Sequence, residues 1–135
     1  MTTPASAEPQ WESRMARLWA SIEHLEPDAF VAQVEALTRE LPEGSAVALF
    51  ERACAQDSTG HPDRSVAMLR EELARGHDEL HGAVRAFLAL ALVDCGRSRE
   101  AAGQALLALS PCLPRYNRSL ERYARELVEP AVDGD

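Results

Sequence analysis

The sequence predicts an all-α fold in which antiparallel helical hairpins stack side by side. The first observation is an internal repeat, because Gly60 and Gly96 lie 36 residues apart at two similar turns. A small residue precedes each glycine by seven positions and another follows it by five, at Ala53, Ala89, Ser65 and Ala101. The second observation is that apolar residues recur at steps of three and four, while the period-two alternation of strands is missing from the sequence.

The N-terminal region predicts one helical pair over residues 10–42. Apolar residues fall on one face of its first helix, at Trp11, Met15, Leu18, Trp19, Ile22 and Leu25. That helix must stop before Pro27, because a proline disfavours helical dihedrals in the residue before it. The second helix presents Phe30, Val34, Leu37 and Leu41 and ends at Pro42. Residues 1–9 and 131–135 are polar or small and are interpreted as disordered tails.

The remainder predicts two helical repeats and a final helix, which makes about seven helices in a single domain over residues 10–130. The first repeat spans residues 45–76, with Gly76 as a left-handed cap, and the second spans residues 78–110, with a helix that starts near Asp78. That helix is the most apolar in the chain and is expected in the middle of the molecule. Residues 114–129 form the final helix, in which Tyr116 and Tyr123 are expected to pack in the core.

The second repeat carries the residues of a known pattern, Leu88, Ala89, Leu92, Gly96, Ala101 and Ala108. In this pattern it resembles the tetratricopeptide repeat (TPR) family, whose repeats have small residues along both helices and glycine at the turn. The first repeat is a weaker match, because Arg52 and Glu72 stand where that family usually has apolar or small residues. Residues 49–130 also resemble an uncharacterised bacterial group within the family, through stretches such as VRAFLALALVDCGRSREA and LPRYNRSLERYAREL. Compared with that group, the chain looks one helical pair shorter.

The resemblance implies a short right-handed superhelix whose concave wall binds a protein or peptide partner. It assigns that wall to Phe50, Cys54, Asp57, Ala86, Leu90 and Asp94. This wall is apolar with acidic ends, and it lacks the Lys and Asn residues with which TPR proteins clamp chaperone carboxylates. An apolar or basic helix, or a second copy of the chain, therefore fits it better. The most favoured assembly is a homodimer with residues such as Trp11, Trp19 and Phe50 at its centre.

The charge of the chain argues against nucleic acid as a partner. All 14 basic residues are arginines, but 22 acidic residues outnumber them and give the chain a net charge of -8. The negatively charged phosphates of a nucleic acid repel such a chain. The final helix differs from the rest, because a basic stripe runs along it at Arg115, Arg118, Arg122 and Arg125. An anionic partner could dock on this stripe. The favoured interpretation is that Glu121, Glu126 and Glu129 neutralise it as surface ion pairs.

The alternative function class is a small metal protein or enzyme that uses His77 and His81. These histidines lie four apart in the segment HDELH, which on a helix would place them on one face, as in a zinc site. No third ligand is evident in the sequence, and Asp78 and Glu79 are ordinary capping residues for a helix start. We therefore expect no metal, no cofactor and no enzymatic activity.

The cysteines and the apolar runs bear on location. Cys54, Cys95 and Cys112 are an odd number without metal-site spacing, which favours free thiols in a reducing cytoplasm. A signal peptide has a basic start followed by an apolar run, and the first nine residues have neither. The longest apolar run covers residues 86–93 and is too short to cross a membrane. A cytoplasmic bacterial protein without membrane contact is therefore expected.

Overall fold

The computed structural model describes residues 4–129 of the chain, and the side chains from residue 10 onward. Most of this part is helical, and no strand occurs within it. The elements are α1 (Pro4–Ala20), η1 (Ile22–His24), α2 (Pro27–Thr38), α3 (Ala46–Ser58), α4 (Pro62–Arg75), α5 (His81–Asp94), α6 (Ser98–Leu109), η2 (Ser110–Cys112) and α7 (Asn117–Val128). The prediction of an all-α fold with about seven helices is confirmed over residues 4–129.

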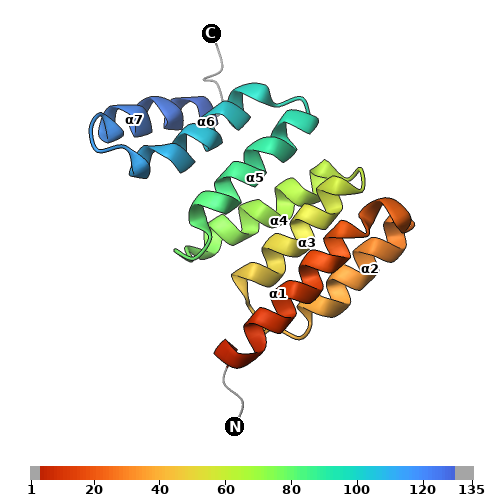
Figure 1. The fold of residues 1–135 in the computed structure, drawn as a ribbon. Helices are drawn as coiled ribbons and strands as arrows, with labels where there is room; N and C mark the ends of the chain where they lie inside the picture. Colours follow the sequence, from red (N-terminus) through yellow and green to blue (C-terminus); the bar gives the residue numbers. More distant parts are fainter. Residues whose placement is uncertain (1–3, 130–135) are drawn as a thin grey trace.

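The helices form hairpins laid next to one another in chain order. Each α-helix packs against the one before it and the one after it, and α3 also touches α5. Figure 1 shows the resulting stack, with the α1–α2 pair at one end and the α6–α7 pair at the other. A stack with neighbour contacts of this kind buries its apolar faces only between adjacent hairpins.

Two apolar clusters hold the stack together. The larger one joins α3, α4, α5 and α6 around the fully buried Leu69, Leu88 and Leu92. The smaller one joins α1, α2 and α3 around the fully buried Phe30 and Val34. Burial of each such side chain contributes about 1.5–3 kcal/mol to folding, so the two clusters account for much of the driving force.

The turns inside the two repeats have the same geometry. Gly60 and Gly96 adopt left-handed φ values of 90° and 76°, in which a side chain would be strained. In each turn the residue after the glycine donates its backbone N–H at 2.9 Å to the carbonyl five positions earlier, from His61 to Gln56 and from Arg97 to Leu92. The small residues predicted to face each other across the hairpins, Ala53, Ala89, Ser65 and Ala101, are all buried. Gly76 has a φ of 73° and is the left-handed cap that the sequence predicted for α4.

Two helix starts differ from the sequence prediction. Residues 4–9, assigned to a disordered tail, belong to α1, because proline is tolerated at a helix start and Ala5, Ala7 and Glu8 favour helix. Residues 1–3 and 131–135 lie outside the described part. The helix expected from Asp78 starts at His81, after Leu80 takes a left-handed φ of 61°. Asp78 and Glu79 therefore lie in the connection between the repeats and do not cap α5.

The last helix lies unusually close to α6. A Cβ atom placed on Gly103 of α6 would come within 2.7 Å of Val128 Cγ2 and 2.8 Å of the Ala124 carbonyl oxygen. Only glycine permits this approach, which lets the backbone of α6 touch α7 directly. The prediction that Tyr116 and Tyr123 pack in the core is wrong, because both rings are exposed. The small Ala124, which is fully buried, takes the position against α6 in their place.

Candidate partner-binding groove

A groove opens between α3 and α5, with contributions from α1 and α4. Its volume is about 360 Å³, within the range of sites that bind small molecules or anchor side chains. Residues of α3 and α5, with one residue each from α1 and α4, line it: Trp19, Phe50, Glu51, Cys54, Asp57, Ser58, Ser65, Phe87 and Leu90. The groove therefore lies at the joint between the two repeats, where α3 faces α5.

Aromatic and aliphatic side chains form the apolar part of this groove. The rings of Phe50 and Phe87 meet edge to face, with their centroids 5.1 Å apart at an angle of 87°. Phe87 is 42% exposed and Leu90 is 56% exposed, and the neighbouring Val93 is also exposed. Helix α5, which the sequence predicted to lie in the middle of the molecule, thus has one buried face and one exposed apolar face. Large apolar side chains left uncovered together are typical of interaction surfaces.

The acidic part of the groove comes from carboxylates that water reaches poorly. Glu51 accepts a hydrogen bond from Trp19 Nε1 at 2.8 Å, and burial raises its pKa above the ordinary value. Burial also raises the pKa of Asp57, and the negative charge of the nearby Asp94 raises it further. Oδ1 of Asp57 is buried and has no hydrogen-bond partner within the described part of the chain. Such an oxygen is costly to leave unsatisfied, which favours a donor from a bound partner.

Cys54 lies in the same groove, but its thiol is chemically inert. Burial raises its pKa to about 12, and the charges of Glu51 and Asp57 contribute to the same shift. The thiol therefore stays protonated at neutral pH, whereas a cysteine nucleophile must be a thiolate. Cys54 acts here as a small, half-buried apolar side chain.

The structure brings together most of the residues that the sequence assigned to the concave wall. Phe50, Cys54, Asp57 and Leu90 all line the groove, and Asp94 acts on Asp57 from α5. Ala86 is half-buried on α5 and is not part of the lining.

Sequence reasoning did not assign five of the lining residues to the wall, namely Trp19, Glu51, Ser58, Ser65 and Phe87. Phe87 carries a signal, since it stands three positions before Leu90 and so shares its face on a helix. Glu51 and Trp19 carry none, because they are far apart in the sequence and meet only through the hydrogen bond between their side chains.

The residues proposed for a homodimer centre have different environments. Trp11 is only 7% exposed, and its Nε1 donates a hydrogen bond to the carbonyl of Leu37 at 2.8 Å. It is a core residue of the α1–α2 pair, so its placement in a dimer contact is wrong. Trp19 and Phe50 remain accessible at the groove, where Trp19 also packs edge to face on Phe30.

The two histidines of the metal alternative do not converge. His77 precedes α5 and its Nδ1 lies 2.7 Å from Oε2 of the buried Glu72, while Nε2 of His81 accepts a hydrogen bond from Arg85 at 3.0 Å. The assumption that both lie on one helical face is wrong, because α5 begins only at His81. Within residues 4–129, no three His, Cys, Asp or Glu side chains gather as a metal site would require.

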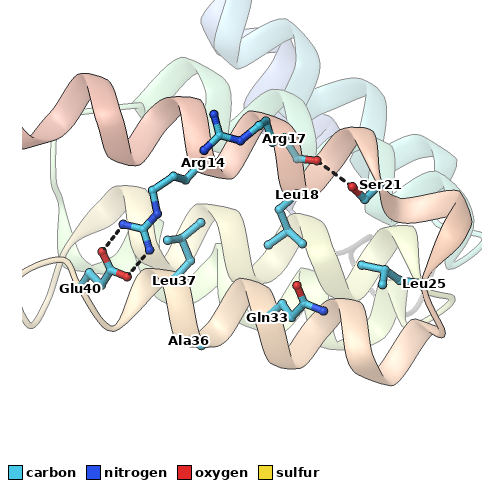
Figure 2. A pocket seen from close by; sticks show the side chains of 9 residues that line it. All are labelled: Arg14, Arg17, Leu18, Ser21, Leu25, Gln33, Ala36, Leu37 and Glu40. Carbon is cyan, nitrogen blue, oxygen red and sulfur yellow. Dashed lines mark hydrogen bonds and ion pairs between the residues drawn. The ribbon is translucent and has the colours of Figure 1, made fainter.

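A second depression, between α1 and α2, differs from the groove in its polar groups. It is floored by Leu18, Leu25 and Leu37, and Figure 2 shows the Arg14 guanidinium closing one end against Glu40. Two guanidinium nitrogens of Arg14 donate to the two carboxylate oxygens of Glu40, each at a distance of 2.7 Å. The pair raises the pKa of Arg14 and lowers that of Glu40. The charges of Arg14 and Glu40 are therefore matched, whereas Arg17, which also lines the depression, has no ion pair among the described residues.

The basic stripe on α7 is only partly neutralised. Arg125 pairs with Glu121 at 3.2 Å, as the ion-pair interpretation expected. Arg115 and Arg122 instead lie over the rings of Tyr116 and Tyr123, 5.2 Å and 4.9 Å from the ring centroids. The start of α7 and its exposed face therefore combine arginines with aromatic rings.

Comparison with protein families identifies the repeat. The family model of the tetratricopeptide repeat matches residues 46–76 and residues 62–127, which together cover more than half of the chain. The chain belongs to the TPR family. The first match spans α3 and α4, and the second runs from α4 into α7. Together the two matches cover the helices of both repeats and nearly all of the final helix. The comparisons with curated proteins and with solved structures returned no match.

Membership of this family supports a role in binding proteins, since stacked helical repeats present an extended concave surface. No helix within residues 4–129 is both long enough and apolar enough to cross a bilayer.

Proposed function

We propose that the chain is a protein-interaction module that holds a segment of a partner in the groove between α3 and α5. The observation that carries the proposal is the combination of exposed Phe87 and Leu90 with the unsatisfied oxygen of Asp57. An isolated monomer gains nothing from leaving apolar side chains in water beside a buried carboxylate oxygen. A bound segment would cover the apolar side chains and donate a hydrogen bond to the carboxylate oxygen.

The chemistry of the groove defines the segment that fits it. Phe50, Phe87 and Leu90 suit an apolar side chain, and the carboxylates of Glu51 and Asp57 suit a positively charged one. No lysine, arginine or histidine is found among the described residues that line the groove. A partner segment with apolar and basic side chains is therefore favoured over an acidic one or a nucleic acid.

The proposal extends to assembly and location. A second copy of the chain is the partner that needs no further protein, which supports a homodimer. The free Cys54, Cys95 and Cys112 support a reducing compartment such as the bacterial cytoplasm. A binding role without catalysis is supported by the protonated thiol of Cys54 and by the separate contacts of His77 and His81.

Selection of a random peptide library on the purified chain tests the groove. Enriched peptides are expected to combine apolar residues with arginine or lysine, because both parts of the groove would then be filled. Leu90→Ser removes an exposed leucine of the groove and should weaken the binding of these peptides by about tenfold, in line with loss of a central apolar contact.

Leu109→Ser is the matched control, since it removes an exposed leucine that lies at the end of α6 and outside the groove. Peptide affinity should stay unchanged in this variant. Enriched peptides that bind the Leu90→Ser chain as tightly as the original would place the binding surface elsewhere. A selection that enriches no peptide would contradict the proposal altogether.

A further inference from the structure

The outer face of α7, together with Arg115 and Tyr116 just before the helix, is a second surface with exposed arginines. Arg115, Arg118 and Arg122 are exposed, and none of the three has an ion pair among residues 4–129. Two of them are held over tyrosine rings, so each forms a ready pair of a cation and an aromatic face. This surface offers positive charge together with apolar area.

The groove offers the complementary groups. It presents the aromatic rings of Phe50 and Phe87 together with the carboxylates of Glu51 and Asp57, and Asp94 adds charge at its edge. Arginine donates well to carboxylates and packs on aromatic rings, so one surface matches the other in both charge and polarity.

The spacing of the charges along the two helices is also compatible with this match. Glu51 and Asp57 are six residues apart on α3, which corresponds to a rise of about 9 Å. Arg118 and Arg122, which both lie on α7, are four residues apart, and this spacing corresponds to a rise of about 6 Å. Because arginine side chains are long and flexible, two arginines of an α7 laid along the groove can reach both carboxylates at once.

We propose that a second copy of this chain is the groove's partner, and that it docks the arginine and tyrosine face of its α7 against Phe50, Phe87, Glu51 and Asp57. This inference rests on the proposed function of the groove and names its occupant. When each copy inserts its α7 into the groove of the other, the two contacts are equivalent and close a two-fold dimer. Both exposed surfaces of each chain are then covered.

A charge-exchange experiment on the full-length chain tests this arrangement. Sedimentation velocity over micromolar concentrations should show wild-type chain in equilibrium between monomer and dimer, with weaker association at high salt. Asp94→Arg places repulsion in the groove, and Arg122→Asp places it on α7. Each variant alone should associate about tenfold or more weakly, as expected when one member of an interfacial charge pair is reversed.

Mixing the two variants is the decisive step. A heterodimer of Asp94→Arg with Arg122→Asp contains one wild-type contact and one contact with exchanged charges, so association should return close to the wild-type level. Arg118→Asp provides a second α7 variant for the same mixture. Arg99→Asp changes an exposed arginine on α6, outside both surfaces, and should leave association unchanged.

Three results would overturn the inference: a wild-type chain that stays monomeric, single variants that associate as strongly as wild type, or a mixture that fails to recover. Circular dichroism on each variant separates these results from loss of folding. A monomeric chain that still selects peptides through Leu90 would leave the groove's function standing and remove only the second copy as its occupant.

Discussion

The two repeats share a backbone plan and differ in what their first helices expose. The α3–α4 and α5–α6 hairpins turn at left-handed glycines with the same hydrogen bond, and both bury small residues where their helices touch. On α3, Phe50 is half-buried beneath neighbours, whereas on α5 the side chains of Phe87 and Leu90 stay open. The turn and the small residues thus determine the hairpin, and the neighbours of each first helix determine which face can bind.

The second helices of the two repeats, α4 and α6, also differ in a buried charge. Glu72 of α4 is 2% exposed, and its carboxylate lies 2.7 Å from His77 Nδ1 and 3.8 Å from Arg75. Thirty-six residues later α6 has the uncharged Ala108. The buried carboxylate of Glu72 therefore has no counterpart at the equivalent position of the second repeat. It connects the end of α4 to the segment that leads into α5.

The largest effect is expected from the two faces of α5. Leu88→Asp should unfold the domain, because it buries an unpaired carboxylate at a fully buried position at a cost above about 4 kcal/mol. Leu90→Asp, on the open face, should leave the melting temperature nearly unchanged. Thermal unfolding followed by circular dichroism measures both variants. Equal melting temperatures would show that α5 does not have one buried and one open face.

An intermediate effect is expected at the buried carboxylate of the first repeat. His77→Ala removes the closest partner of Glu72 and should lower the free energy of unfolding by about 1–3 kcal/mol, since a buried acceptor loses its hydrogen bond. Urea unfolding measures the change. His24→Ala, at an exposed position in η1, is the control and should have little effect. A loss no greater than that of the control would mean that Glu72 is satisfied without His77.

Smaller and equal effects are expected at the two turns. Gly60→Ala and Gly96→Ala should each lower the free energy of unfolding by about 1 kcal/mol, because both glycines have left-handed dihedrals and no atom lies within 4 Å of the added methyl group. Gly96→Val should cost more, since a β-branched side chain is poorly tolerated there. Clearly unequal costs for the two alanine variants would contradict the equivalence of the turns.

The smallest effect is expected at Asp57. Its raised pKa means that the folded chain holds the proton more tightly than the unfolded chain does. The resulting loss of stability is absent below the ordinary pKa of aspartate, grows as pH rises through the folded pKa, and is complete above it. Asp57→Asn should therefore raise the melting temperature slightly at pH 7 and not at pH 3, whereas Asp78→Asn, in an exposed connection, should change neither. A lowered melting temperature at pH 7 would contradict this sign.

Local rules predicted much of this fold from the sequence. Glycine spacing, proline breaks and helical periodicity predicted the hairpins and their turns, because each depends on residues close in the chain. The start of α5 was misplaced, since Leu80 adopts a left-handed conformation that is rare for leucine.

The candidate site was only partly predictable, because it depends on packing between helices. Glu51 joins the groove through its contact with Trp19 of α1, and the exposure of Tyr116 and Tyr123 follows from the close approach of α6 to α7. Neither contact has a signature in the order of residues along the chain.

The glycine at position 103 has a consequence for how the chain can change. It anchors α7 through backbone contact and the small Ala124, so the attachment of this helix does not depend on its outward side chains. Substitutions at those outward positions can accumulate with little risk to the fold. The arginine and tyrosine face is thus free to diversify, and a lineage could acquire new binding preferences there while the anchoring glycine stays fixed.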